Sequence, residues 1–415
     1  MKNYWSLLKN NTPFLTIMIA DLISQAGDII FTIALSWSIL ESTDSVLAAS
    51  LIPFFRSLSQ ALISIISGLI TDSFSRRKLM IFSMFCQSII LLIFLPFVQG
   101  DLQGNLLIFL PLTLVLYLFS TIGKDAQNVM IPDIVKKENL ITANSIDVML
   151  KRIVIASISA LAGLLTTLLS LSTILLINSI SFIIPAFLLL IFLPEVKMIE
   201  DKTEDIKSNG WLDDLKEGWY YIRNDSFTLV FMLLLVFLNF PYSAMGIFPL
   251  AYLNKVLDAK ASLYGLTKSI TFIATIVSMY LVGSLKIFNQ KPIKFFTIGV
   301  VGAGAVLLFL TPVFPNSVIL TLAIFFSFHF LDSLSQPVFV IFRGRIPTQI
   351  RGRVFGLFNA CVLIITPLFT LVSGYMMDRI DLGIMALIIS FSFMVIGMFS
   401  RKMEIEKNEI TSHNI

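Results

Sequence analysis

Long apolar runs are the feature of this sequence that most limits how the chain can fold. A helix needs about 20 consecutive, mostly apolar residues to cross the hydrocarbon core of a membrane. We predict such helices over 14–40, 46–70, 79–98, 105–129, 141–168, 172–193, 227–250, 263–286, 294–312, 317–342, 354–377 and 382–400. The sequence therefore predicts an all-α integral membrane protein with twelve transmembrane helices, arranged as two six-helix pseudo-repeat bundles.

The composition agrees with a membrane protein and gives no sign of an enzyme. Of the 415 residues 56% are hydrophobic and only 13% are charged, whereas soluble domains average about 25% charged residues. The two cysteines, Cys86 and Cys361, lie in apolar runs without metal-ligand spacing, and no HExxH, P-loop or GxSxG motif occurs. We expect no enzymatic activity, no cofactor, no metal site and no nucleic-acid partner.

A polar segment separates the two sets of helices. We expect three parts: a bundle over 1–193, a cytoplasmic linker over 194–226, and a bundle with a short cytoplasmic tail over 227–415. In the linker, WLDDLKEGWYYI places Trp211, Leu215, Trp219 and Ile222 at helical spacing. This pattern predicts a short amphipathic helix on the inner membrane surface.

The basic residues predict the orientation. They gather in alternate gaps between the runs, at Arg76, Arg77, Lys78, Lys136, Lys137, Lys286, Lys291, Lys294, Arg343, Arg345, Arg351 and Arg353. The opposite gaps hold Lys255, Lys260 and Arg379. Because cytoplasmic loops carry the excess of Lys and Arg, both termini and the linker are expected in the cytoplasm.

The two halves also share a local pattern. IPDIVKKENLITAN and IPTQIRGRVFGLFN both run from Ile-Pro to Asn with equal spacing, Pro132 to Asn144 and Pro347 to Asn359. Each follows the fourth helix of its half, which favours a structural repeat.

Six plus six helices with a charged gap after the second resemble the major facilitator superfamily. GLITDSFSRRKLM is similar to the signature loop of that family and matches it at Gly68, Asp72, Arg76, Arg77 and Lys78. Ser73 and Ser75 replace the usual Arg and Gly. The resemblance implies that Asp72 latches the two halves on the cytoplasmic side, while the bases meet anionic headgroups. Alternatively, the loop only sets the orientation.

Three further stretches resemble the macrolide-efflux and enterobactin-exporter branch of that family. They are SQAGDIIFTIALSW, MIPDIVKKENLITANS and IPTQIRGRVFGLFNA. The fifth helix lacks the Gly-Pro motif that many drug–proton antiporters carry there. The resemblance implies an exporter.

Helix 1 carries ionisable side chains that a bilayer disfavours. Asp21, Gln25 and Asp28 share one face, and Asp28 is near mid-bilayer, where a charge costs about 2.5–3.5 kcal/mol. By resemblance this face lines the central cavity, so Asp28 and Asp21 are candidates for proton coupling. Alternatively, Asp21 is solvated by headgroups, and Asp28 pairs with Arg56 of helix 2 or makes a structural hydrogen bond.

Helix 10 carries a second set, His329, Asp332 and Gln336, at spacings of three and four. Desolvation and a neighbouring imidazole suit a carboxyl group to proton transfer. We take Asp332 as the first candidate for coupling, with Asp28 second and His329 in support. Alternatively, His329 and Asp332 form a polar pair that only stabilises the packing between helices.

Other polar groups are expected to be structural or to line the cavity. Asp147 and Lys151 suit an i, i+4 pair in helix 5, and Lys124 and Asp125 end helix 4 and snorkel or join that pair. The candidates for the substrate cavity are Gln25, Gln336, Asn239, Phe240, Tyr242 and Met245.

Together these features predict a secondary transporter of the bacterial cytoplasmic membrane. We expect a monomer that exports amphipathic molecules such as macrolides by alternating access in exchange for protons, in contact with membrane lipids. The alternatives are a siderophore or metabolite exporter, a lysophospholipid transporter of the same fold, and a non-transporting sensor or scaffold.

Overall fold

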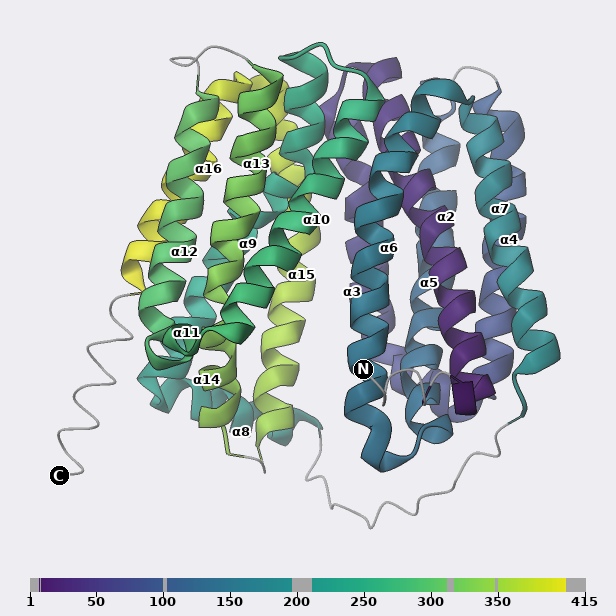
Figure 1. The fold of residues 1–415 in the computed structure, drawn as a ribbon, viewed down its shortest axis with the longest axis horizontal. Coiled ribbons are helices and arrows are strands. Elements are labelled where there is room, and N and C mark those ends of the chain that lie inside the picture. Colours follow the sequence, from purple (N-terminus) through teal and green to yellow (C-terminus); the bar gives the residue numbers. More distant parts are fainter. Residues whose placement is uncertain are drawn as a thin grey trace. The chain divides into compact units, whose positions relative to one another are not determined.

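A computed structural model describes residues 7, 9–99, 103–195, 211–311, 317–347 and 350–400 of the chain. The first half of the predicted linker and the C-terminal tail lie outside these residues. Within the described part, twelve helical segments are long and apolar enough to cross a membrane. The predicted all-α, twelve-span architecture is therefore confirmed (Figure 1).

The chain divides into two compact units. Unit 1 holds α2 to α7 and the first part of α10, and unit 2 holds α8, α9, the remainder of α10 and α11 to α16. The helices of the first half are α2 (Thr12–Thr43), α3 (Val46–Ser73), α4 (Arg76–Val98), α5 (Leu106–Ile134), α6 (Leu140–Leu168) and α7 (Leu171–Phe192). Those of the second half are α8 (Trp211–Asn224), α9 (Ser226–Lys255), α10 (Ala261–Ser284), α11 (Lys286–Gln290), α12 (Pro292–Leu307), α13 (Val318–Asp332), α14 (Pro337–Arg345), α15 (Arg351–Arg379) and α16 (Leu382–Phe399).

Local sequence signals set several helix ends. The Asn11 side chain accepts a hydrogen bond from the backbone N–H of Phe14 at the start of α2. At the other end, Asp44 adopts a left-handed backbone with φ of 52°, and Ser45 caps α3. Because an N-cap side chain satisfies an orphan N–H and a left-handed residue ends a helix, α2 and α3 join by a very short turn.

In unit 1, α2 is packed against α6 and α7. Gly27 permits this contact, since a Cβ built on it would lie 1.9 Å from Ser181 Oγ and 2.5 Å from Asn178 Oδ1 of α7. Small residues let helix backbones approach closely in membranes. This contact therefore holds α2 in place at the residue next to Asp28.

In unit 2, aromatic rings and close backbone contacts form the core. Phe231 of α9 packs against Phe296, Phe339 and Phe342. Ser390 of α16 donates a hydrogen bond of 2.7 Å to the Gly304 carbonyl of α12. These contacts join α9, α12, α14 and α16 around one apolar interior.

Two helices differ from the predicted ranges in ways that matter for the site. The helix expected over 105–129 continues to Ile134, so α5 is five residues longer at its C-terminal end. The helix expected over 317–342 is broken, because α13 ends at Asp332 and a 3₁₀ segment, η3 (Ser333–Ser335), precedes α14. Pro337, at the start of α14, has no N–H to continue the helical hydrogen bonds and disfavours helix before it.

Candidate functional site

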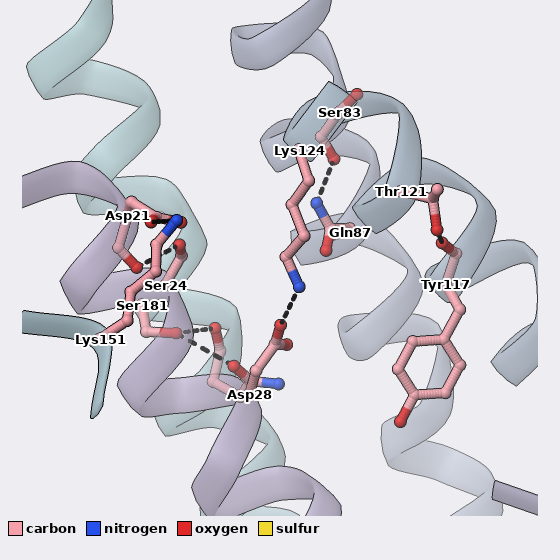
Figure 2. A network of polar contacts seen from close by, with 11 residues as sticks. Asp21, Ser24, Asp28, Ser83, Gln87, Tyr117, Thr121, Lys124, Lys151 and Ser181 are labelled. Carbon is pink, nitrogen blue, oxygen red and sulfur yellow. Dashed lines mark hydrogen bonds and ion pairs between the residues drawn. The ribbon is translucent and has the colours of Figure 1, made fainter. Parts of the chain in front are cut away.

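Unit 1 contains a cluster of charged side chains within its transmembrane helices (Figure 2). Two of them, Asp21 and Asp28, come from α2, and Asp28 lies near the middle of that helix. Asp21 is buried, and the Asp28 side chain is only 16% exposed. We call Asp21, Asp28, Lys124, Asp147 and Lys151 the unit 1 charge cluster.

Lys151 of α6 joins two carboxylates of this cluster. Its Nζ lies 2.9 Å from Asp21 Oδ2 and 2.9 Å from Asp147 Oδ1. Asp147 is the i, i+4 partner expected from the sequence. The alternative of a headgroup-solvated Asp21 is wrong, because Asp21 is buried and paired with Lys151 across the α2–α6 contact.

Asp28 has a different partner from the one that we considered. Lys124 Nζ of α5 lies 3.8 Å from Asp28 Oδ2, whereas Arg56 acts on Asp28 through its charge without forming an ion pair. Lys124 lies ten residues before Ile134, the last residue of α5, and not near the helix end as expected. The longer helix therefore carries this lysine to the depth of Asp28.

A small cavity of about 30 Å³ lies beside both aspartates. This volume is enough for one or two water molecules, since about 10–15 Å³ by this measure holds one. Its polar lining includes Ser24, Gln87 and Gln127, and its apolar lining includes Met84 and Phe182. Gln127 is buried and its Nε2 has no hydrogen-bond partner among the described residues, so it offers the cavity an unused donor.

The basic residues of the signature-like loop bind neighbouring helices. Arg76 forms an ion pair with Asp133 in the last turn of α5. Arg77 donates a 2.6 Å hydrogen bond to the Leu190 carbonyl of α7 and lies 3.8 Å from Glu195. The expectation that all three bases meet headgroups is therefore wrong for Arg76 and Arg77, which connect α4 to α5 and α7.

The roles expected for Asp72 and Gly68 of the same loop remain predictions. Gly68 and Asp72 lie in α3, but the surroundings of Gly68 and the side chain of Asp72 fall outside the part that the structure describes. Lys78 is exposed and lies 3.8 Å from Glu195.

In unit 2, Asp332 is held by a residue of another helix. The Tyr242 hydroxyl of α9 donates a hydrogen bond to Asp332 Oδ1 of α13. The ring of His329 lies edge-on against Phe328, with 5.1 Å between the ring centroids. Gln336 is exposed and follows η3, so the expected stripe of His329, Asp332 and Gln336 on one continuous helix is wrong.

The remaining cavity candidates make contacts inside their own units. Asn239 Oδ1 accepts a 2.7 Å hydrogen bond from Thr366 of α15, and the Phe240 ring lies edge-on against Phe369. Met245 is buried. Gln25 has a buried Oε1 without a protein hydrogen bond.

A charged cluster that the sequence analysis missed joins the start of α9 to the end of α14. Arg345 Nη2 lies 2.7 Å from Asp225 Oδ1, and its Nε lies 3.0 Å from both carboxylate oxygens. Asp225 also caps α9, accepting from the Thr228 N–H. Burial alone raises the pKa of Asp225, but the hydrogen bonds from Arg345 and Thr228 lower it below its usual value.

The short helix α8 packs beside this cluster, against α9 and α15. Glu217 pairs with Arg353, and Gly218 lies against the backbone and side chain of Arg353. The predicted short helix is present as α8; on its expected apolar face Ile222 is buried and Trp219 is 55% exposed, and its place on the membrane surface stays a prediction. The other two residues of that face, Trp211 and Leu215, have no described side chains.

A family match identifies this arrangement of helices. The sequence model of the Major Facilitator Superfamily matches residues 17–368. The chain belongs to the Major Facilitator Superfamily. It is therefore a multi-pass membrane transporter of that type.

Solved structures of other family members share the fold at low sequence identity. A bacterial homologue of the iron transporter ferroportin, in an inward-facing state, is 17% identical with a TM-score of 0.68, over 94% of this chain and 98% of that one. The nucleoside transporter NupG is 13% identical with a TM-score of 0.72, over 94% of this chain and 98% of that one. The human organic anion transporter MFSD10 is 13% identical with a TM-score of 0.64, over 94% and 99%. No curated protein matches this chain.

Within the described residues, no group of three or more His, Cys, Asp or Glu side chains is placed to hold a metal ion.

Proposed function

We propose that this transporter exports an amphipathic small molecule from the cytoplasm by alternating access, in exchange for protons that enter. Both termini are on the cytoplasmic side of a bacterial cytoplasmic membrane in this proposal. The observation that carries it is the loose pair of Asp28 and Lys124, which lies in the transmembrane part of unit 1 beside a polar cavity.

The chemistry of that pair suits exchange. A carboxylate can bind a proton or a cationic group but not both, so the two ligands oppose each other at one site. Exchange transport requires such a coupling free energy between proton and substrate. The 3.8 Å separation of Asp28 and Lys124 is longer than a charge-assisted hydrogen bond of about 2.7–2.9 Å, so the carboxylate keeps binding capacity.

Asp332 is the second proposed coupling group. The Tyr242 hydroxyl donates a hydrogen bond to the Asp332 carboxylate, and protonation of Asp332 replaces this charge-assisted bond by a weaker neutral one. A proton at Asp332 therefore changes the contact between α9 and α13.

Transport of an anion is the main alternative. Arg56 is exposed and Lys124 is partly exposed in the transmembrane part of unit 1, so an anionic siderophore or metabolite would find two bases there. By their descriptions, the solved relatives are a bacterial homologue of an iron transporter, a nucleoside transporter and an organic anion transporter, so this fold serves several charge types. A lysophospholipid, with both charge signs and a long chain, is a further candidate.

Inside-out vesicles with an acidic interior test the proposal. We expect wild-type protein to accumulate a fluorescent lipophilic cation or a macrolide only while the pH gradient lasts. Asp28→Asn and Asp332→Asn should each abolish the gradient-dependent part, while Glu138→Gln, an exposed carboxylate outside both clusters, should leave it intact. Accumulation that ignores the gradient would refute proton exchange, and uptake of organic anions alone would favour the alternative.

A further inference from the structure

We propose that Lys124 is a tethered competitor at Asp28, which occupies the carboxylate in the empty transporter and is displaced by the cationic group of a substrate. This inference rests on the proposed export function and narrows its substrates to amphipathic molecules that carry a positive charge.

The two partners differ in how firmly they are held. Asp28 follows Gly27, whose backbone lies against Ser181 and Asn178 of α7, so the backbone that carries Asp28 is held by packing between two helices, and its short side chain has little reach. Lys124 reaches Asp28 with a flexible four-carbon stem, and its side chain is 44% exposed. If the pair separates, the lysine is therefore the partner that moves.

Lys151 provides an internal comparison. Its ammonium lies 2.9 Å from each of two carboxylates, Asp21 and Asp147. Among the residues that the structure describes, Lys124 has one carboxylate partner within 4 Å, Asp28 at 3.8 Å. Because the attraction between charges weakens with distance, Lys124 is the easier of the two lysines to displace.

The net charge of the unit 1 charge cluster favours a cation in the place of Lys124. The unit 1 charge cluster has three carboxylates, Asp21, Asp28 and Asp147, against two lysines. When Lys124 leaves, Lys151 remains with the other two carboxylates, and Asp28 loses the one counter-ion that lies within 4 Å of it in the described part of the chain. Arg56 acts on Asp28 from a longer range.

The adjacent cavity has the surfaces that a cationic amphiphile requires. Met80, Met84 and Phe182 line its apolar part. Thioether side chains adapt to different shapes, and an aromatic ring attracts a cation to its face. Gln127 adds a buried amide whose Nε2 has no protein partner, so a polar group of the ligand can bind there.

At about 30 Å³ the cavity is too small for a whole amphiphile while Lys124, one of its lining residues, is paired with Asp28. Drug-sized ligands occupy roughly 300–1,000 Å³. Withdrawal of the lysine side chain therefore enlarges the site as well as freeing the carboxylate.

Equilibrium binding of tetraphenylphosphonium to the purified full-length protein tests this inference without any gradient. The apparent affinity of a ligand falls by the fraction of time that its site is competent. Lys124→Gln should therefore bind about three- to tenfold more tightly than wild type. Lys124→Arg, which keeps a competing charge, should not improve binding.

Arg56→Gln is the matched control because it removes a nearby positive charge that is not paired with Asp28. Simple repulsion predicts equal gains for both variants, whereas displacement predicts a larger gain for Lys124→Gln. Asp28→Asn should weaken tetraphenylphosphonium binding about tenfold or more. Combined with Asp28→Asn, Lys124→Gln should no longer tighten binding. Tetraphenylborate, which has the same shape and the opposite charge, should gain nothing from Lys124→Gln.

Equal gains for the two charge removals, or a gain that persists with Asp28→Asn, would overturn the inference. So would the absence of tetraphenylphosphonium binding in every variant. Tight binding with no gradient-driven transport would refute the proposed export and leave this site standing. Gradient-driven transport by a protein in which Lys124→Gln does not tighten tetraphenylphosphonium binding would refute this inference and leave the proposed export function standing.

Discussion

The Tyr242 hydroxyl donates a hydrogen bond to the Asp332 carboxylate, across 90 residues of sequence. The bond joins α9 to α13 one residue before the helix breaks at Ser333. It places an ionisable group at the junction between two helical segments of unit 2.

Removing the hydroxyl tests what this bond contributes. Tyr242→Phe leaves a buried acceptor without its donor, which costs about 1–3 kcal/mol, and more for a charged group. We expect a lower thermal midpoint in detergent. Asp332→Asn and the double variant complete the cycle, and a coupling energy near zero would show that the two side chains act independently.

Lys151 should be essential to the stability of unit 1. Lys151→Met strands two carboxylates, and breaking a buried pair costs about 3–5 kcal/mol, with the lower end expected because the lysine side chain is 26% exposed. Differential scanning fluorimetry should show a large drop in the thermal midpoint. Adding Asp21→Asn and Asp147→Asn should recover much of it, and failure to recover would mean that the lysine acts through packing.

The Asp225–Arg345 pair should make stability depend on acidity. Because the folded pKa of Asp225 is lowered, its contribution is complete above the usual value of 3.8 and is lost as the pH falls through the folded pKa. Asp225→Asn keeps an N-cap oxygen but removes the charge, so it should flatten this part of the acid-unfolding curve. An unchanged curve would contradict the assignment. Asp225→Ala should cost about 0.5–2 kcal/mol more, through the lost cap.

Arg76 and Asp133 should be interchangeable if they act as a pair. Arg76→Asp alone places two acids together and should reduce folded protein and transport. Arg76→Asp combined with Asp133→Arg should restore both, which would be measured as membrane expression and vesicle uptake. If Arg76 only contacts headgroups, the second substitution will give no rescue.

Gly27 should tolerate no side chain. Gly27→Ala places a methyl group 1.9 Å from Ser181 Oγ, and overpacking of this kind costs about 1–3 kcal/mol. We expect lower thermal stability, partly rescued by Ser181→Gly. Gly246→Ala is the control, because a Cβ there would meet no described atom within 4 Å beyond its chain neighbours and the nearby backbone of its own helix.

The sequence predicted what depends on local pattern. Apolar runs set the twelve spans, and the i, i+4 spacing brought Asp147 to Lys151. It did not predict the partners of Asp28 and Asp332, because pairing between helices depends on their relative rotation and depth. A five-residue error in the end of α5 was enough to misplace Lys124.

The sequence contained residues that indicate the end of a helix after α13, but the high hydropathy of the whole segment favoured one continuous helix. Ser333, Ser335 and Pro337 follow Asp332 closely, and a proline disfavours helical backbone in the residue before it. Because the residues on both sides of this point are apolar, the apolar pattern predicted a single helix over 317–342.

The broken helix gives unit 2 a jointed element. α14 has nine residues, or roughly 13 Å at 1.5 Å per residue, and it lies between η3 and the Arg345 anchor on Asp225. Because the pair with Asp225 fixes Arg345 at the C-terminal end of α14, we expect a change in the backbone at η3 to act first on this ion pair.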